Sequence, residues 1–276
     1  MSQQGAPQID ANLLKMMSQA QGQQNNNLYS VPTMLVDLPS RGSLYPEGHP
    51  LYNKETIEIK YMTAKEEDIL LNTSYIEKGV VLEKLLESVI LDRAIKVDTL
   101  LSGDKSAIQI ACRSNAYGED YEFEYVCNSC GTKNELSINI NELNHYHVDF
   151  DKIKSDGGIF IDLPVSKKKV KAKILTGEDD KAIQARIDQK KKHGLPEQFI
   201  IERYKQIFSE IDGNQDPMYI ASFVQNMAIR DSRYFMKQYM KMLPGVDFTY
   251  DHACIKCGSE NKGGVPVGAS FFYPNE

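Results

Sequence analysis

The sequence lacks a run of apolar residues that approaches the ~20 needed for a helix to cross a bilayer. Its first residues, Met1 to Gly5, also lack the basic segment and following apolar segment of a secretory signal. Positive charge is scarce, since 32 Lys and Arg residues stand against 38 Asp and Glu residues, for a net charge of −6. Phosphate binding needs concentrated positive charge. We therefore expect a protein without a membrane span, made in a cytosol, whose partners are proteins rather than nucleic acids.

Recognisable catalytic motifs are missing as well. Neither a Gly-x-Ser-x-Gly turn nor a His-Glu-x-x-His pair occurs. The segment from Gly103 to Ser106 superficially resembles a phosphate-binding loop, but the adjacent Gly-Lys and the earlier glycine of that loop are absent. The scattered acids do not single out a general acid and base. The sequence therefore predicts no enzyme and no small-molecule substrate.

The chain of 276 residues is long enough to bury a core, and 41% of it is hydrophobic. Residues 1–28 differ from the rest because they are rich in Gln, Asn and Ser. Such a composition cannot offset the entropy lost when a chain becomes ordered. We interpret 1–28 as a disordered arm that precedes the folded part.

We interpret the remaining sequence as two copies of one pattern, through 29–150 and 151–276. Three signals recur in the same order: Val36-Asp37-Leu38-Pro39 matches Ile161-Asp162-Leu163-Pro164, the segment 57–68 matches 170–180, and a Cys-x-x-Cys-Gly turn closes each half. Strand-turn-helix units are common, so chance similarity is the alternative to a duplication.

Local patterns in the two halves predict the same elements. Apolar residues alternate with polar ones over 57–61 and 170–174, which is typical of half-buried strands. Thr63 and Thr176 are each followed by an acid at the third position, so each is expected to cap a helix. Further helices are predicted over 80–90, 105–114, 183–191, 197–208, 218–229 and 232–242, and returning strands over 121–125 and 246–250. We expect an α+β fold whose two strand-helix-strand halves pack around a shared site.

Four of the five cysteines form that predicted site. Cys127 and Cys130 make one Cys-x-x-Cys-Gly turn, and Cys254 and Cys257 make the other. A two-residue spacing lets one turn direct both sulfurs at one ion, and the glycine permits the backbone conformation that this needs. Four thiolates close a tetrahedral shell, so the sequence predicts a structural Zn²⁺ site resembling a zinc ribbon.

The gap between the turns leaves alternatives open. Cys130 and Cys254 are 124 positions apart, far more than in an ordinary ribbon, which suggests two half-sites joined across the repeat. A redox pair, an iron–sulfur cluster and unligated thiols are the other interpretations. His252 could compete as a ligand but is expected in a strand, and His145 and His147 are expected in a sheet or loop. The fifth cysteine, Cys112, is expected to be buried.

Two runs of lysine bear on nucleic-acid binding. Lys167 to Lys169 and Lys190 to Lys192 are locally basic. Solvated strand and helix faces explain such runs in a chain that is acidic overall, and contacts to nucleic acid are the alternative.

Several motifs together resemble a known family. They are Leu38-Pro39-Ser40-Arg41-Gly42, Leu44-Tyr45-Pro46, Ile57 to Lys60, Met62-Thr63, Lys65 to Asp68, the two cysteine turns and the closing Ser270-Phe271-Phe272-Tyr273-Pro274. In these features the chain resembles baseplate hub proteins of contractile-tailed, T-even-like bacteriophages, with the cysteine turns similar to those of members that carry zinc ribbons.

The resemblance implies a noncatalytic protein that builds the central hub of the tail baseplate or helps to assemble it. Its partners would be other tail and baseplate proteins. It would be found in the host cytoplasm during assembly and, if it is a resident subunit rather than an assembly factor that leaves, in the tail baseplate of the virion. A zinc-ribbon protein that binds nucleic acid or assists transcription is the alternative. Leu44 and Tyr45 are candidate partner contacts because a Pro/Gly turn is expected to expose them; an intramolecular turn that caps the sheet is the other interpretation.

Overall fold

The computed structural model describes residues 30–146, 148, 153, 158–267 and 269–272. The predicted arm 1–28 therefore lies outside the described residues. The chain divides into two units, Met1–Pro32 and Thr33–Glu276. All elements below belong to the second unit.

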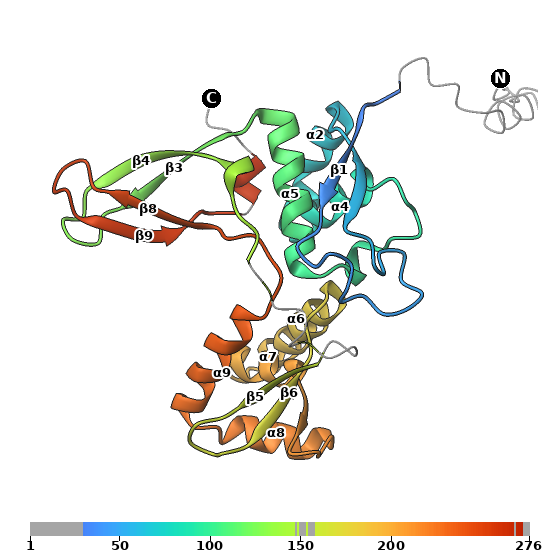
Figure 1. The fold of residues 1–276 in the computed structure, drawn as a ribbon, viewed down its shortest axis with the longest axis vertical. Helices are drawn as coiled ribbons and strands as arrows, with labels where there is room; N and C mark the ends of the chain where they lie inside the picture. The colour runs from blue at the N-terminus through green and yellow to red at the C-terminus, as the bar shows by residue number, and fades with distance from the viewer. Residues whose placement is uncertain (1–29, 147, 149–152, 154–157, 268, 273–276) are drawn as a thin grey trace, which may run out of the picture. The chain divides into compact units, whose positions relative to one another are not determined.

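Small antiparallel sheets and helices alternate along this unit (Figure 1), which confirms the predicted α+β class. The strands are β1 (Thr33–Asp37), β2 (Thr56–Lys60), β3 (Asp120–Val126), β4 (Lys133–Asn139), β5 (Ile159–Asp162), β6 (Lys169–Ala172), β7 (Phe208–Ile211), β8 (Thr249–Ala253) and β9 (Glu260–Gly264). The α-helices are α2 (Ala64–Leu70), α3 (Thr73–Glu77), α4 (Val81–Val89), α5 (Ser102–Tyr117), α6 (Gly177–Lys192), α7 (Phe199–Ile207), α8 (Pro217–Gln225) and α9 (Ile229–Lys241). Short 3₁₀ helices are η1 (Val97–Thr99), η2 (Ile140–Glu142) and η4 (Ala269–Phe272).

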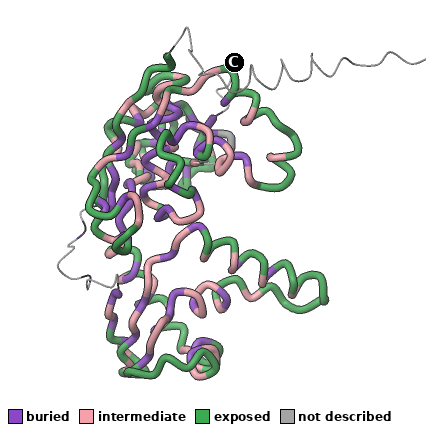
Figure 2. The backbone as a smooth tube through the Cα atoms, turned by 90° about the vertical axis from the view of Figure 1, so that its right-hand side faces the viewer, coloured by how far each residue is buried: buried purple, intermediate pink, exposed green. Residues whose placement is uncertain are grey.

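Buried apolar residues form two clusters. Figure 2 colours the buried residues purple along the backbone. The first cluster combines apolar residues of β1, β2, α4, α5 and β3 with residues that follow α9, among them Val246, Phe271 and Phe272. The second lies among β5, β6, β7 and helices α6 to α9. The segment after α9 thus returns to the first cluster, which brings the two ends of the described chain into one core.

A β-hairpin opens each half of the unit. β1 pairs antiparallel with β2, from Thr33 opposite Lys60 to Asp37 opposite Thr56. β5 pairs antiparallel with β6, and β6 also pairs with β7. The predicted alternation appears in burial: Ile57 and Ile59 of β2 are buried, and so are Val170 and Ala172 of β6.

The predicted helix caps form in both halves by the same set of contacts. Thr63 and Glu66 make a capping box at the start of α2, and Thr176 and Asp179 make one at the start of α6. A lysine bonds each acid, from the last residue of β2 in the first half and from the residue just after β6 in the second: Lys60 Nζ lies 2.6 Å from Glu66, and Lys173 Nζ lies 2.6 Å from Asp179. Each acid therefore ties a strand end to a helix start.

A second acid in each half holds the turn of its hairpin. Asp104, the third residue of α5, accepts hydrogen bonds from the backbone N–H of Ser40 (3.0 Å) and from its hydroxyl (2.6 Å). Asp231, the third residue of α9, accepts from the backbone N–H groups of Val165 (2.7 Å) and Ser166 (2.9 Å). Both carboxylates are buried. Each long helix is thereby fastened to the Leu-Pro turn of its own half.

Each long helix leads into a two-stranded ribbon, β3–β4 after α5 and β8–β9 after α9. The strand predicted over 246–250 begins later, at Thr249. Val246 instead pairs with His145 in an isolated bridge, and the Asp247 carboxylate accepts the backbone N–H of Thr249 at 3.0 Å. This side-chain turn interrupts the extended segment before β8 starts.

Candidate metal centre

The four predicted ligands come together at the ends of the two ribbons. One sulfur atom from each of Cys127, Cys130, Cys254 and Cys257 lies within 4.8 Å of all the others. Each pair lies in the turn between the strands of one ribbon, where Gly131 (φ 70°) or Gly258 (φ 67°) follows the second cysteine in the left-handed region. The long gap between the turns is thus closed in space.

The spacing of the sulfurs suits one tetrahedral ion. Cys127 Sγ lies 3.8 Å from Cys257 Sγ, and Cys130 Sγ lies 3.7 Å from Cys254 Sγ. Sulfurs about 2.3 Å from a central ion at tetrahedral angles are separated by about 3.8 Å. The separations are too long for disulfide bonds, which measure about 2.05 Å. The donor set therefore fits a closed four-thiolate site.

Hydrogen bonds and burial shift the pKa values of three of the four thiols in different directions. The backbone N–H of Cys130 is the main group that lowers the pKa of Cys127, to about 6, and the N–H of Cys257 is the main one that lowers the pKa of Cys254. The N–H of Ser259 acts to lower the pKa of Cys257, but hydrogen bonds with the neighbouring cysteine sulfurs, together with burial, outweigh it and raise that pKa to about 11. Four thiolates at this spacing therefore need a cation among them.

Two asparagines, which sequence reasoning missed, lock each turn to the opposite ribbon. Asn134 of β4 accepts the backbone N–H of Ile255 at 3.0 Å, and Asn261 of β9 accepts that of Asn128 at 3.0 Å. Asn261 also donates to Cys127 Sγ at 3.6 Å. Asn134 is 1% exposed and Asn261 is 3% exposed.

A signal for these asparagines is present in the sequence. Each lies four residues after the second cysteine of its turn, so the repeated motif is Cys-x-x-Cys-Gly-x-x-Asn rather than Cys-x-x-Cys-Gly alone. A polar residue repeated at one offset from a metal ligand indicates an outer-shell partner.

The other residues considered as ligands lie elsewhere. His252 is in β8, as predicted, and its ring packs edge-on against Tyr125 at 6.0 Å between centroids. Cys112 is buried in α5, and burial raises the pKa of its thiol to about 12. His145 is exposed beside Val246, and His147 lies outside the described residues.

The expected exposure of the turn at Tyr45 is wrong. Tyr45 is 4% exposed, its hydroxyl donates to Asp104 at 2.7 Å, and its ring stacks on His49 at 4.3 Å between centroids. Leu44 is half-buried and packs against both core clusters. The buried Asp104 carboxylate needs donors, and the tyrosine supplies one. The intramolecular turn, the alternative interpretation, accounts for these contacts.

A comparison with protein-family models gives a match. The model of a family described as T4 bacteriophage base plate protein matches residues 33–272. Neither the curated proteins nor the solved structures give a match. Among the helices of the described residues, none combines the length and hydrophobicity needed to span a bilayer. Because the match extends over nearly all of the folded unit, the chain belongs to the T4 bacteriophage base plate protein family.

Proposed function

We propose that this chain is a noncatalytic structural or assembly protein of the phage tail baseplate hub and acts through contacts with other baseplate proteins. The observation that carries the proposal is the family match over residues 33–272. The protein would act in the host cytoplasm while the tail is assembled and could be retained in the virion tail. The resemblance of several sequence motifs to those of hub proteins supports the hub in particular.

Exposed apolar side chains support a role in protein contacts. Met218 of α8 is 81% exposed, Ile229 at the start of α9 is 77% exposed, and Ile255 within the second cysteine turn is 76% exposed. Covering any of these side chains with a partner would remove apolar surface from water, which is favourable.

We also infer that Cys127, Cys130, Cys254 and Cys257 hold a structural Zn²⁺ ion. The closed tetrahedral donor set supports zinc and leaves no position for a substrate or water. Metal analysis of the purified protein should find one zinc per chain, and Cys130→Ser with Cys257→Ser should remove it and lower the melting temperature. Iron in place of zinc, or an unchanged melting temperature in the double variant, would contradict the inference.

The contacts of the two lysine runs argue against the alternative of a protein that binds nucleic acid. Lys168 pairs with Asp212 at 2.7 Å, and Lys190 pairs with Glu202 at 2.8 Å. Lys169 lies over the ring of Phe160, 5.3 Å from its centroid. These contacts engage three of the six lysines in the two runs, which leaves less positive charge available to nucleic acid.

Affinity purification from phage-infected cells, combined with a search for the chain in purified virions, tests the proposed role. Recovery with tail or baseplate proteins is expected. Detection in virions would indicate a resident subunit, and its absence there an assembly factor that leaves. Salt-sensitive retention of DNA or RNA without tail proteins would favour the alternative instead.

The partner contact predicted at Leu44 and Tyr45 stays a prediction that Leu44 alone can test. Tyr45→Ala would disturb the core, since this side chain is buried. Leu44→Ala changes a half-buried side chain. If baseplate assembly is unaffected in a folded Leu44→Ala variant, the contact is excluded.

A further inference from the structure

The edge of β1 that faces away from β2 carries backbone groups that β2 does not use. β1 belongs to a two-stranded sheet whose other member is β2. Leu38 donates its backbone N–H to Glu55 at 2.8 Å, so by the alternation of an antiparallel ladder Leu35 and Asp37 direct their backbone groups away from β2. Glu58 lies opposite Leu35, and its carbonyl accepts the backbone N–H of Leu91 on the side of β2 that faces away from β1. The backbone groups of Glu58 therefore point away from β1, as the same alternation requires. Among the described residues, no strand other than β2 pairs with β1.

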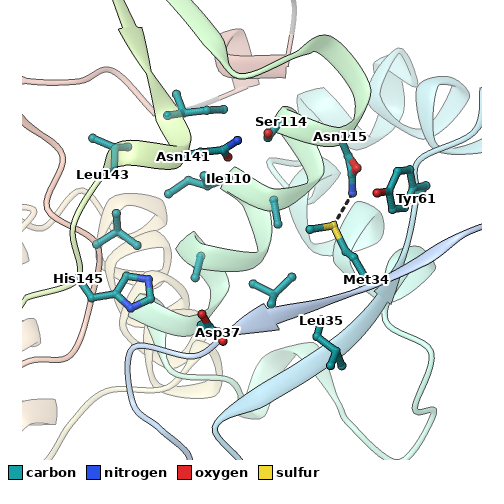
Figure 3. Close-up of a pocket in the computed structure, with 15 residues that line it drawn as sticks. Met34, Leu35, Asp37, Tyr61, Ile110, Ser114, Asn115, Asn141, Leu143 and His145 are labelled. Carbon is teal, nitrogen blue, oxygen red and sulfur yellow. Dashed lines mark hydrogen bonds between the residues drawn. The ribbon is translucent and has the colours of Figure 1, made fainter.

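This edge borders a groove with a volume of about 610 Å³ (Figure 3). Helix α5 forms the floor, with Ala107, Ile110 and Ala111 among the lining residues. The segment from Ile140 to His145 lines the opposite side and is extended at Leu143 (φ −64°, ψ 124°). An extended chain between these walls could bond to the edge of β1 and place apolar side chains over α5.

The charges around the groove favour a basic occupant. Among its lining residues Asp37 is the one formally charged side chain, and no described cation lies within ion-pair distance of it. Glu58 is exposed on the same face of the hairpin as Asp37. Lys60, at the end of β2, is engaged by Glu66 at 2.6 Å. The outer face of the edge is therefore acidic.

The two faces of β1 call for different side chains on a strand that pairs with it. Met34 and Val36 face α5 and pack in the first core cluster, whereas Leu35 is 66% exposed. A strand added beside β1 would have the same alternation, with apolar residues toward α5 and lysine or arginine beside Asp37.

We propose that the outer edge of β1 and this groove bind an extended segment of a partner protein in which apolar residues alternate with lysine or arginine. β1 has five residues, so the added strand would span roughly 17 Å. The inference rests on the proposed assembly role for the identity of the natural partner, but the edge itself can be tested with a synthetic peptide.

A capped heptapeptide that alternates Lys and Val is the probe, and the same peptide with Glu for Lys is its control. We expect saturable binding of the lysine peptide, with slowed hydrogen exchange over 33–37 and 140–146, and little binding of the glutamate peptide. Absence of saturable binding, equal binding of both peptides, or protection confined to other regions would overturn the proposal.

Substitutions separate the backbone edge from its side chains. Leu35→Pro removes an outward N–H that β2 does not use, and should weaken binding about tenfold, whereas Leu35→Ala, which keeps the N–H, should not. Asp37→Lys should also weaken it, while Asp162→Lys at the matching position of β5 should leave it unchanged. If the two Leu35 variants weaken binding equally, or if Asp37→Lys and Asp162→Lys do, this mode of binding is refuted. If Leu35→Pro does not fold, the comparison of Asp37→Lys with Asp162→Lys tests the proposal.

The peptide assay and the purification from infected cells can fail separately. Loss of peptide binding with continued recovery of baseplate proteins would refute the edge and keep the assembly role. Peptide binding without recovery of baseplate proteins would support the edge as a binding site and refute the assembly role.

Discussion

The buried asparagines beside the cysteines allow a sharp test of the metal centre. Asn261→Ala removes a donor to Cys127 Sγ (3.6 Å) and the acceptor of the Asn128 backbone N–H (3.0 Å). The side chain is 3% exposed, so water cannot easily replace it. Each lost hydrogen bond costs about 1 kcal/mol and an unpaired buried group adds to this, so the free energy of unfolding should fall by about 2 to 3 kcal/mol. Metal affinity should fall by about 10- to 100-fold, as for other outer-shell partners.

The matched control is Asn128→Ala. Asn128 is exposed in the same turn and contributes its backbone N–H, which alanine retains. Competition with a zinc-binding dye measures the affinity, and thermal melting of the zinc-loaded protein measures stability. If Asn261→Ala and Asn128→Ala behave alike in both assays, the asparagine does not organise the site and the reasoning is refuted.

Three further changes test the anchors of the first half. Tyr45→Phe removes a donor from buried Asp104 and should cost about 1.5 to 3 kcal/mol in urea unfolding. Burial acts to raise the pKa of Glu66, but hydrogen bonds, chiefly from a lysine, lower it to about 2. Its contribution is therefore present above the unfolded pKa near 4.5 and is lost as the pH falls toward 2, so Glu66→Gln should destabilise by about 2 to 4 kcal/mol at pH 7 and by less at pH 3. Gly42→Ala should lower the melting temperature more than Gly48→Ala, because both have positive φ but a Cβ meets neighbouring backbone only at Gly42.

The sequence was informative where a structural requirement is local. Alternation over 57–61 and 170–174 predicted β2 and β6, and Thr63 and Thr176 predicted the starts of α2 and α6. A strand with one buried face and a helix cap each depend on residues a few positions apart. The spacing of each cysteine pair is equally local, so the motif by itself was enough to select the four sulfurs that cluster in the fold.

Requirements that join distant residues were not visible in the same way. A Pro/Gly turn suggested an exposed Tyr45, but its burial depends on Asp104, which is 59 positions away. Asn134 fixes Ile255 across 121 positions. The repeated offset from the cysteines marks the asparagines themselves, but nothing in the sequence marks which distant backbone group each of them bonds, or that Tyr45 bonds Asp104.

The entropic cost of closing the long loop between the two cysteine turns can be compared with the free energy that a bound metal contributes. The loop between Cys130 and Cys254 spans 124 positions, about eight times the length in a compact ribbon. Three doublings of loop length cost about 2 kcal/mol in closure entropy, whereas a structural zinc ion contributes roughly 10 to 16 kcal/mol. Since Asn134 and Asn261 each fix the opposite turn, neither ribbon completes the site alone. A metal bound here would therefore couple the two ribbons, which is the role expected of a structural ion rather than a catalytic one.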